Sequence, residues 1–131
     1  MKYILAVLII YLSCNVATAE NLKCFYRNAE GVGNDDVDIY YDKDSINYPE
    51  KKKSFFGEKP NKAIIEVWEV MKFLKSKTEI KTFKRLNCDT RELILKAMIA
   101  NGTYAYPPQI GRTYPIEPKT TDEKLFKILC R

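Results

Sequence analysis

The sequence predicts an α+β fold: an antiparallel meander of about five to six strands, with a C-terminal helix packed on the sheet and tied to it by a disulfide. Three observations lead to this prediction. Apolar and polar residues alternate in successive segments between residues 22 and 100, as in strands buried on one face. Residues 120–130 instead have the spacing of an amphipathic helix. Cys88 ends one predicted strand and Cys130 ends this helix.

The N-terminal residues have the composition of an export signal. Lys2 is followed by an uncharged apolar run, residues 3–13 (YILAVLIIYLS), which is too short to span a bilayer. Ala17-Thr18-Ala19 then fits the small-residue rule for cleavage. We therefore predict a signal peptide at residues 1–19 and one exported domain at residues 20–131, in the periplasm, at the cell surface or outside the cell.

Cys14 offers an alternative to cleavage after Ala19. A cysteine directly after an apolar run is a lipid attachment site in some bacterial exported proteins, and a lipid there would anchor the chain to a membrane. Tyr11-Leu12-Ser13 fits that pattern poorly. We expect membrane attachment only if Cys14 is lipidated.

Three cysteines remain after the predicted cleavage, which leaves one over when two of them pair. A terminal helix frays unless it is held, and a bond from Cys130 to Cys88 would hold it in an oxidising compartment. The bond would close a loop of about forty residues, worth roughly 4 kcal/mol on chain-entropy grounds. Cys24 is then expected to be a buried reduced thiol or to bond a second chain, and a swapped pairing stays open.

The exported domain begins with two predicted strands. Residues 22–27 (LKCFYR) and residues 37–41 (VDIYY) both alternate, and the glycines, asparagine and aspartates of residues 29–36 form a turn between them. A second turn, residues 42–46, leads into a polar segment. This segment, residues 47–61, is predicted to be a long exposed loop because prolines and a glycine interrupt it.

The loop carries the candidate partner-binding residues. Long loops in compact domains are usually functional or disordered. Exposed aromatic rings beside a run of lysines give a partner apolar anchors and electrostatic steering. The predicted partner-binding residues are Lys51, Lys52, Lys53, Phe55 and Phe56.

Three longer strands follow, at residues 62–74, 78–88 and 91–100. The connections between them are short, which indicates an antiparallel meander. Simple alternation places Leu93, Leu95, Ala97 and Ile99 of the last strand on the inner face. A turn at Asn101-Gly102 ends this strand or leads into residues 103–106. Four prolines then exclude regular structure up to the terminal helix: Pro107, Pro108, Pro115 and Pro118.

The terminal helix has a start signal and an apolar stripe. Thr120 and Glu123 form a capping box. Leu125, Ile128 and Leu129 share one face and are expected to pack on the sheet.

Composition argues against several chemistries. The chain has no histidine, which removes the commonest general base and metal ligand. Cysteines oxidised after export are poor nucleophiles. We therefore predict no enzymatic activity, no cofactor and no metal; the aspartates between residues 35 and 44 could bind calcium but lack the EF-hand ligand order. The net charge is only +5, with acidic residues interleaved, so no nucleic-acid partner is expected.

The order of several short motifs resembles the bacterial surface-adhesin protein E family. These motifs are Tyr40-Tyr41-Asp42-Lys43-Asp44-Ser45-Ile46, Val67-Trp68 and Asn87-Cys88, followed by Leu125-Phe126-Lys127-Ile128-Leu129-Cys130. The resemblance covers nearly the whole exported domain. It departs from the family at Phe126, where tryptophan is common, at the extra Cys24, and in the longer segment 47–61.

The resemblance implies a six-stranded antiparallel sheet, a C-terminal helix fixed by the disulfide, and non-catalytic adhesion to host extracellular-matrix proteins. The shared motifs do not define ligand-binding segments, so no adhesive residue is transferred. We predict an exported, non-enzymatic binding protein with a protein partner. The alternative is a periplasmic accessory or inhibitor protein without host contact. A homodimer is also expected, because the first strand is a natural sheet edge.

Overall fold

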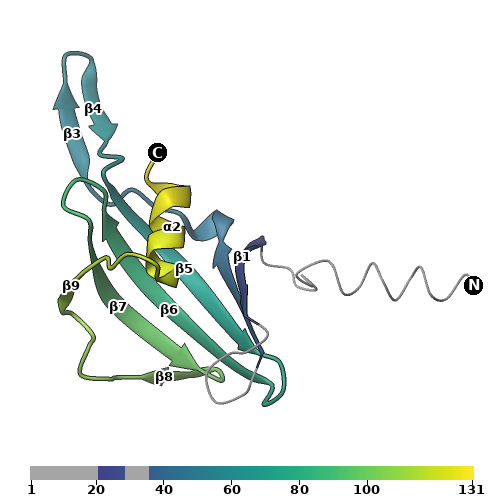
Figure 1. Ribbon diagram of the computed structural model, residues 1–131. Helices are drawn as coiled ribbons and strands as arrows, with labels where there is room; N and C mark the ends of the chain where they lie inside the picture. The colour runs from purple at the N-terminus through teal and green to yellow at the C-terminus, as the bar shows by residue number, and fades with distance from the viewer. Residues whose placement is uncertain (1–20, 29–35) are drawn as a thin grey trace, which may run out of the picture.

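Antiparallel strands form one main sheet in the computed structural model, and a single C-terminal helix packs on it (Figure 1). The structure describes residues 21–28 and 36–131. The predicted signal peptide, Cys14 and all but the last residue of the predicted turn at 29–36 lie outside these residues. The predicted α+β class, the antiparallel sheet and the helix are confirmed.

The main sheet has seven strands, one more than the upper end of the prediction. Six of them follow the order β1-β2-β5-β6-β7-β8, and β9 also pairs with β7. This is a meander interrupted once, between β2 and β5, by the separate two-stranded sheet β3-β4. The main-sheet strands are β1 (Leu22–Asn28), β2 (Val37–Asp42), β5 (Ile64–Phe73), β6 (Thr78–Asn87), β7 (Glu92–Ala100), β8 (Thr103–Ala105) and β9 (Thr113–Pro115).

The three long strands β5, β6 and β7 form the centre of the sheet. Their β-branched and large apolar residues suit a pleated surface covered on both sides. Helix α2 (Thr121–Leu129) covers one face, and long side chains lie over the other. On this second, helix-free face Trp68 stacks on Phe83, with ring centroids 5.1 Å apart.

A β-bulge in β7 overturns the simple alternation predicted for that strand. Leu95 pairs with Lys84 and Ala97 pairs with Phe83, so Lys96 is the extra residue. The side chains beyond the bulge therefore point to the opposite face from the one predicted. Leu93 lies in the core under the helix, whereas Ile99 lines the helix-free face beside Trp68.

Two other predictions need correction. Pro115 does not exclude a strand, because it is the last residue of β9, which pairs with the first residues of β7. A proline, which has no backbone N–H to donate, is tolerated at the end of a short outer strand. Residues 47–61 are not an irregular loop: they contain β3 (Lys51–Ser54) and β4 (Gly57–Pro60), which form a hairpin. A short 3-10 helix, η2 (Lys43–Ser45), occupies the predicted turn before it.

Helix α2 begins as the sequence predicts. The Thr120 side chain accepts a hydrogen bond from the Glu123 amide at 3.2 Å, and the Glu123 carboxylate accepts one from the Lys119 amide. Leu125 and Phe126 are buried in the core, and Leu129 packs against it. Ile128, predicted to pack there, is outside this cluster. The helix therefore points Phe126 toward the core. The guanidinium carbon of Arg91 lies 4.8 Å from the centre of the Phe126 ring.

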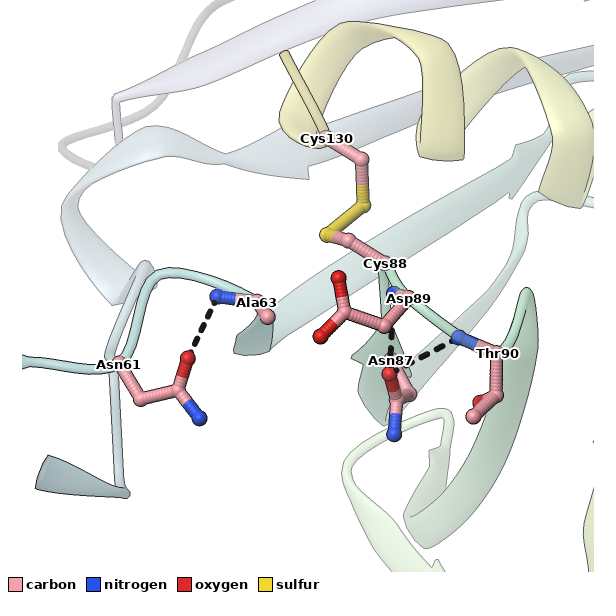
Figure 2. Close-up of a disulfide and its surroundings, with 7 residues drawn as sticks. All are labelled: Asn61, Ala63, Asn87, Cys88, Asp89, Thr90 and Cys130. Carbon is pink, nitrogen blue, oxygen red and sulfur yellow. Dashed lines mark hydrogen bonds between the residues drawn. A yellow bond between two sulfur atoms is a disulfide. The ribbon is translucent and has the colours of Figure 1, made fainter. Parts of the chain in front are cut away.

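The disulfide between Cys88 and Cys130 joins the end of the helix to the turn after β6, as predicted (Figure 2). The two Cα atoms are 5.5 Å apart. Cys24 is disulfide-bonded within the chain as well, so its predictions as a buried reduced thiol and as a bond to a second chain are both wrong. The swapped pairing is also excluded, because Cys88 and Cys130 bond each other. β1 lies at the edge of the strand order, as the predicted homodimer requires, and the dimer itself stays a prediction.

A buried ion-pair network ties the start of the helix to the sheet. The Lys84 ammonium donates to Glu69 at 2.9 Å and to Asp122 of α2 at 2.7 Å. Burial would lower the pKa of Lys84, but the two carboxylates outweigh it and raise the pKa. Burial also raises the pKa of Glu69, whose second oxygen, like the Thr82 hydroxyl, has no hydrogen-bond partner among the described residues.

We expect Cys130→Ser to lower the free energy of unfolding by about 2–4 kcal/mol, because the bond restrains a long loop and holds the helix end. Urea denaturation of the oxidised protein measures the change. Cys88→Ser and the double variant should lose the same amount, since each removes the same bond. A double variant that loses twice as much would contradict this account.

Substitutions at the two buried members of this network, Lys84 and Glu69, should lower the free energy of unfolding by very different amounts. Lys84→Met should cost about 3–5 kcal/mol, because it leaves the Glu69 carboxylate buried without a cation. Glu69→Gln should cost under about 1 kcal/mol, because the amide removes the buried charge and brings a donor opposite Thr82.

The Glu69→Gln comparison also depends on pH. The folded-state pKa of Glu69 lies above its unfolded value, so its contribution to stability is present at low pH and is lost as the pH rises from about 4.5 through the raised pKa. Wild-type stability should fall relative to Glu69→Gln over that window. A constant difference between pH 4 and 8 would contradict the assignment.

Candidate functional site: a hairpin with an aromatic tip

Strands β3 and β4 form a hairpin that projects beyond the end of the main sheet (Figure 1). Four pairs of residues face each other across it, from Lys51 opposite Pro60 to Ser54 opposite Gly57. The Ser54 hydroxyl closes the last pair by donating to the Gly57 carbonyl at 2.7 Å. All five predicted partner-binding residues, Lys51, Lys52, Lys53, Phe55 and Phe56, lie on this hairpin.

The turn of the hairpin depends on Gly57. Phe55 and Phe56 occupy the turn, and neither is among the residues with positive φ. Gly57 follows them with φ +115°, a conformation that other residues rarely adopt. An ordinary turn followed by a glycine is a common way to close a hairpin, and it permits bulky residues in the turn itself.

The two phenylalanines at the tip have almost no contact with the rest of the domain. Phe55 is 97% exposed and Phe56 is 87% exposed. Their rings meet edge to face, with centroids 5.3 Å apart and an interplanar angle of 83°. A pair of rings this exposed contributes nothing to the packing of the folded domain, and exposed apolar patches of this kind are candidate contact surfaces.

The root of the hairpin is fixed to the main sheet at both ends. Asn47 and Glu66 exchange backbone hydrogen bonds of 2.9 and 2.8 Å, and the Asn61 amide donates to the Glu50 carbonyl at 2.7 Å. The Asn61 side chain also accepts a hydrogen bond from the Ala63 amide (Figure 2), and the Ala63 carbonyl accepts one from the Cys88 amide. The disulfide therefore lies two hydrogen bonds away from the hairpin.

Glu66 strengthens this root electrostatically. Its carboxylate accepts from Lys96 at 2.8 Å, from Arg85 at 3.3 Å and from the Asn47 side chain at 3.4 Å. Burial would raise the pKa of Glu66, but the two cations outweigh it and lower the pKa. The contribution of the Glu66 ion pairs to stability is therefore present at neutral pH and is lost only as the pH falls through the lowered pKa of Glu66.

The lysines of the hairpin and its root lack the ion pairs that several other lysines make. Elsewhere in the described residues, an acid pairs with each of Lys81, Lys84, Lys96 and Lys127. None of the five at the hairpin and its root has an ion pair within the described part of the chain: Lys51, Lys52, Lys53, Lys59 and Lys62. Sequence reasoning missed Lys59, because only the strand register brings it to this surface.

Two of these lysines face each other. Lys52 lies directly opposite Lys59 in the ladder, and like charges in that position destabilise a hairpin. Glu58, the one acid on the hairpin strands, lies opposite Lys53 instead. Neither lysine has an ion pair within residues 21–28 and 36–131 that would offset this repulsion.

Two other surface hollows were not predicted. One, of about 240 Å³, lies on the helix-free face and is lined by Asp42, Trp68, Val70, Lys81 and Ile99. A wider one, of about 380 Å³, lies beside the disulfide between Lys62, Arg91 and Arg131. Both are open and shallow, and neither brings together a nucleophile and a base.

Residues 21–28 and 36–131 contain no group of three or more potential metal ligands. No helix within the same residues is long and apolar enough to cross a membrane. The chain matches no protein-family model, no curated protein and no solved structure in the three comparisons made. Membership of the protein E family therefore stays a prediction from the motifs.

Gly57→Ala should loosen the hairpin without affecting the core. An added Cβ meets no atom within 4 Å, so the cost comes from the backbone conformation alone and should be about 1–3 kcal/mol. Hydrogen exchange should become faster at the backbone amides of β3 and β4, with little change in β5 to β7. Gly102→Ala, at the turn before β8, is the matched control and should leave β3 and β4 unchanged.

Proposed function

We propose that this chain is an exported, non-enzymatic binding protein and that the β3–β4 hairpin contacts its partner. The observation that carries the proposal is the exposed Phe55-Phe56 pair at the end of a projecting hairpin whose lysines have no ion pairs among the described residues. Exposed aromatic anchors with flanking charge are a common binding arrangement.

The position of the hairpin supports this assignment. It forms a sheet of its own, and an isolated two-stranded hairpin is at best marginally stable in water. The domain nevertheless fixes its root through Glu66 and Asn61. A feature that is held in place yet contributes nothing to the core is better explained by binding than by stability.

The motif resemblance names extracellular-matrix proteins as the first partners to test. A periplasmic accessory or inhibitor protein is the alternative. The Cys88–Cys130 disulfide is compatible with export in either case.

Replacing Phe55 and Phe56 with serine should weaken partner binding at least tenfold, because both rings are lost as anchors. The melting temperature should change little, since neither ring touches the core. Binding is measured on immobilised matrix proteins and, separately, by pull-down from a periplasmic extract.

Serine substitutions at Tyr104 and Tyr106 provide the control, because both are exposed aromatics outside the hairpin, on β8 and directly after it. These changes should leave binding intact. A large fall in the melting temperature of the phenylalanine variant, or equal loss of binding in the tyrosine variant, would contradict the assignment.

A further inference from the structure

We propose that the surface recognised by the hairpin is an anionic lipid bilayer, with Phe55 and Phe56 inserted at the headgroup boundary and the lysines on the lipid phosphates. This inference rests on the proposed function in one respect: the β3–β4 hairpin is the part of the domain that contacts a partner. The partner inferred here is a membrane surface instead of a protein.

The shape of the tip fits a bilayer. Phe55 and Phe56 stand at the convex end of a turn. A protein partner would need a matching pocket, whereas a bilayer accepts a convex apolar tip directly. Burying each phenylalanine at the interface strengthens partitioning by roughly tenfold to a hundredfold.

The length of the hairpin fits as well. Four residues of extended strand span roughly 13 Å, and interfacial segments enter a bilayer by roughly 5–10 Å. The tip can therefore reach the acyl boundary while the main sheet stays outside. At that depth Lys52, Lys53 and Lys59 come level with the headgroups, and their flexible stems let the ammonium groups reach the phosphates.

The presence of lysines rather than arginines on the hairpin favours a lipid partner over a protein partner. Lysine is depleted from protein–protein interfaces, where arginine and aromatic residues predominate. Near an anionic membrane each lysine strengthens binding about fivefold. The Lys52–Lys59 repulsion is relieved by phosphates without any fixed geometry, because a lipid surface supplies mobile anions.

Lipid binding of this kind needs two signals together. Either a short apolar insertion or a basic patch alone gives marginal, reversible attachment, and the two combined hold a domain. The hairpin carries both within ten residues, Lys51 to Pro60. Reversible, charge-dependent attachment is therefore the expected behaviour.

The test is co-sedimentation of the full chain with vesicles of phosphatidylcholine alone and of phosphatidylcholine mixed with phosphatidylglycerol. Wild type should bind the mixed vesicles strongly and the neutral ones weakly, and added salt should release it. Phe55→Ser with Phe56→Ser should weaken binding to the mixed vesicles at least a hundredfold. Lys51→Gln, Lys52→Gln and Lys53→Gln combined should weaken it about a hundredfold, and only on the anionic vesicles.

Two matched controls isolate the hairpin. Tyr104→Ser with Tyr106→Ser removes exposed aromatics elsewhere, and Lys43→Gln, Lys77→Gln and Lys119→Gln together remove three exposed lysines elsewhere. Both sets should retain binding within about fivefold. Every variant keeps the same N-terminus, so any contribution of the apolar residues 3–13 is equal in all of them.

Equal binding of wild type and the hairpin variants, or no preference of wild type for anionic vesicles, would overturn the inference. If vesicle binding is absent but the phenylalanine variant loses a matrix protein or periplasmic partner, the hairpin is a protein-binding element and the proposed function stands. If the variant loses neither vesicles nor a protein, the proposed function fails with it.

Discussion

The packing of helix α2 on the sheet is the interaction on which the rest of the domain depends. A helix of nine residues has to cover apolar residues from three long strands, Val67, Leu86 and Leu93. Packing alone gives so short a helix little stability. The chain adds a covalent bond at the end of the helix and a partly buried ion pair at its start, so both ends are fixed. Cys88 also connects, through Ala63 and Asn61, to the hairpin root, and one turn thus supports the helix and the projecting hairpin together.

Two glutamates on β5 form ion pairs on opposite faces of the sheet. Glu69 lies under the helix with a raised pKa, and Glu66 lies on the opposite face with a lowered one. As the pH falls, Glu69 takes up its proton first, which relieves the cost of a buried charge. Glu66 keeps its charge to lower pH and continues to hold the hairpin root. Mild acid therefore leaves the hairpin in place.

Periodicity and capping were enough to predict the helix and the long strands, because both are local signals. The disulfide joins residues 42 apart in sequence and was predicted instead from the need to hold the terminal helix. The hairpin was missed because lysine, serine, glycine and proline have low strand propensity, and because two phenylalanines in a turn contradict the usual preference for small residues there. The bulge at Lys96 leaves no mark on the sequence, yet it reverses the faces beyond it. Lys84 and Glu69 were also missed, since alternation treats a charged residue as facing solvent.

The candidate site was predicted in its residues but not in its shape. Lys51 to Lys53 and the two phenylalanines were identified from composition, whereas Lys59 joins them only through the strand register. The strand register also distinguishes the lysines of the hairpin from the paired lysines elsewhere. Elsewhere in the described residues several lysines pair with acids, and Lys84 lies between two acids, so the fold neutralises lysine where stability requires it. At the hairpin Lys52 instead lies opposite Lys59, and neither lysine has an ion pair among the described residues, so the hairpin keeps a local repulsion that the fold does not neutralise there.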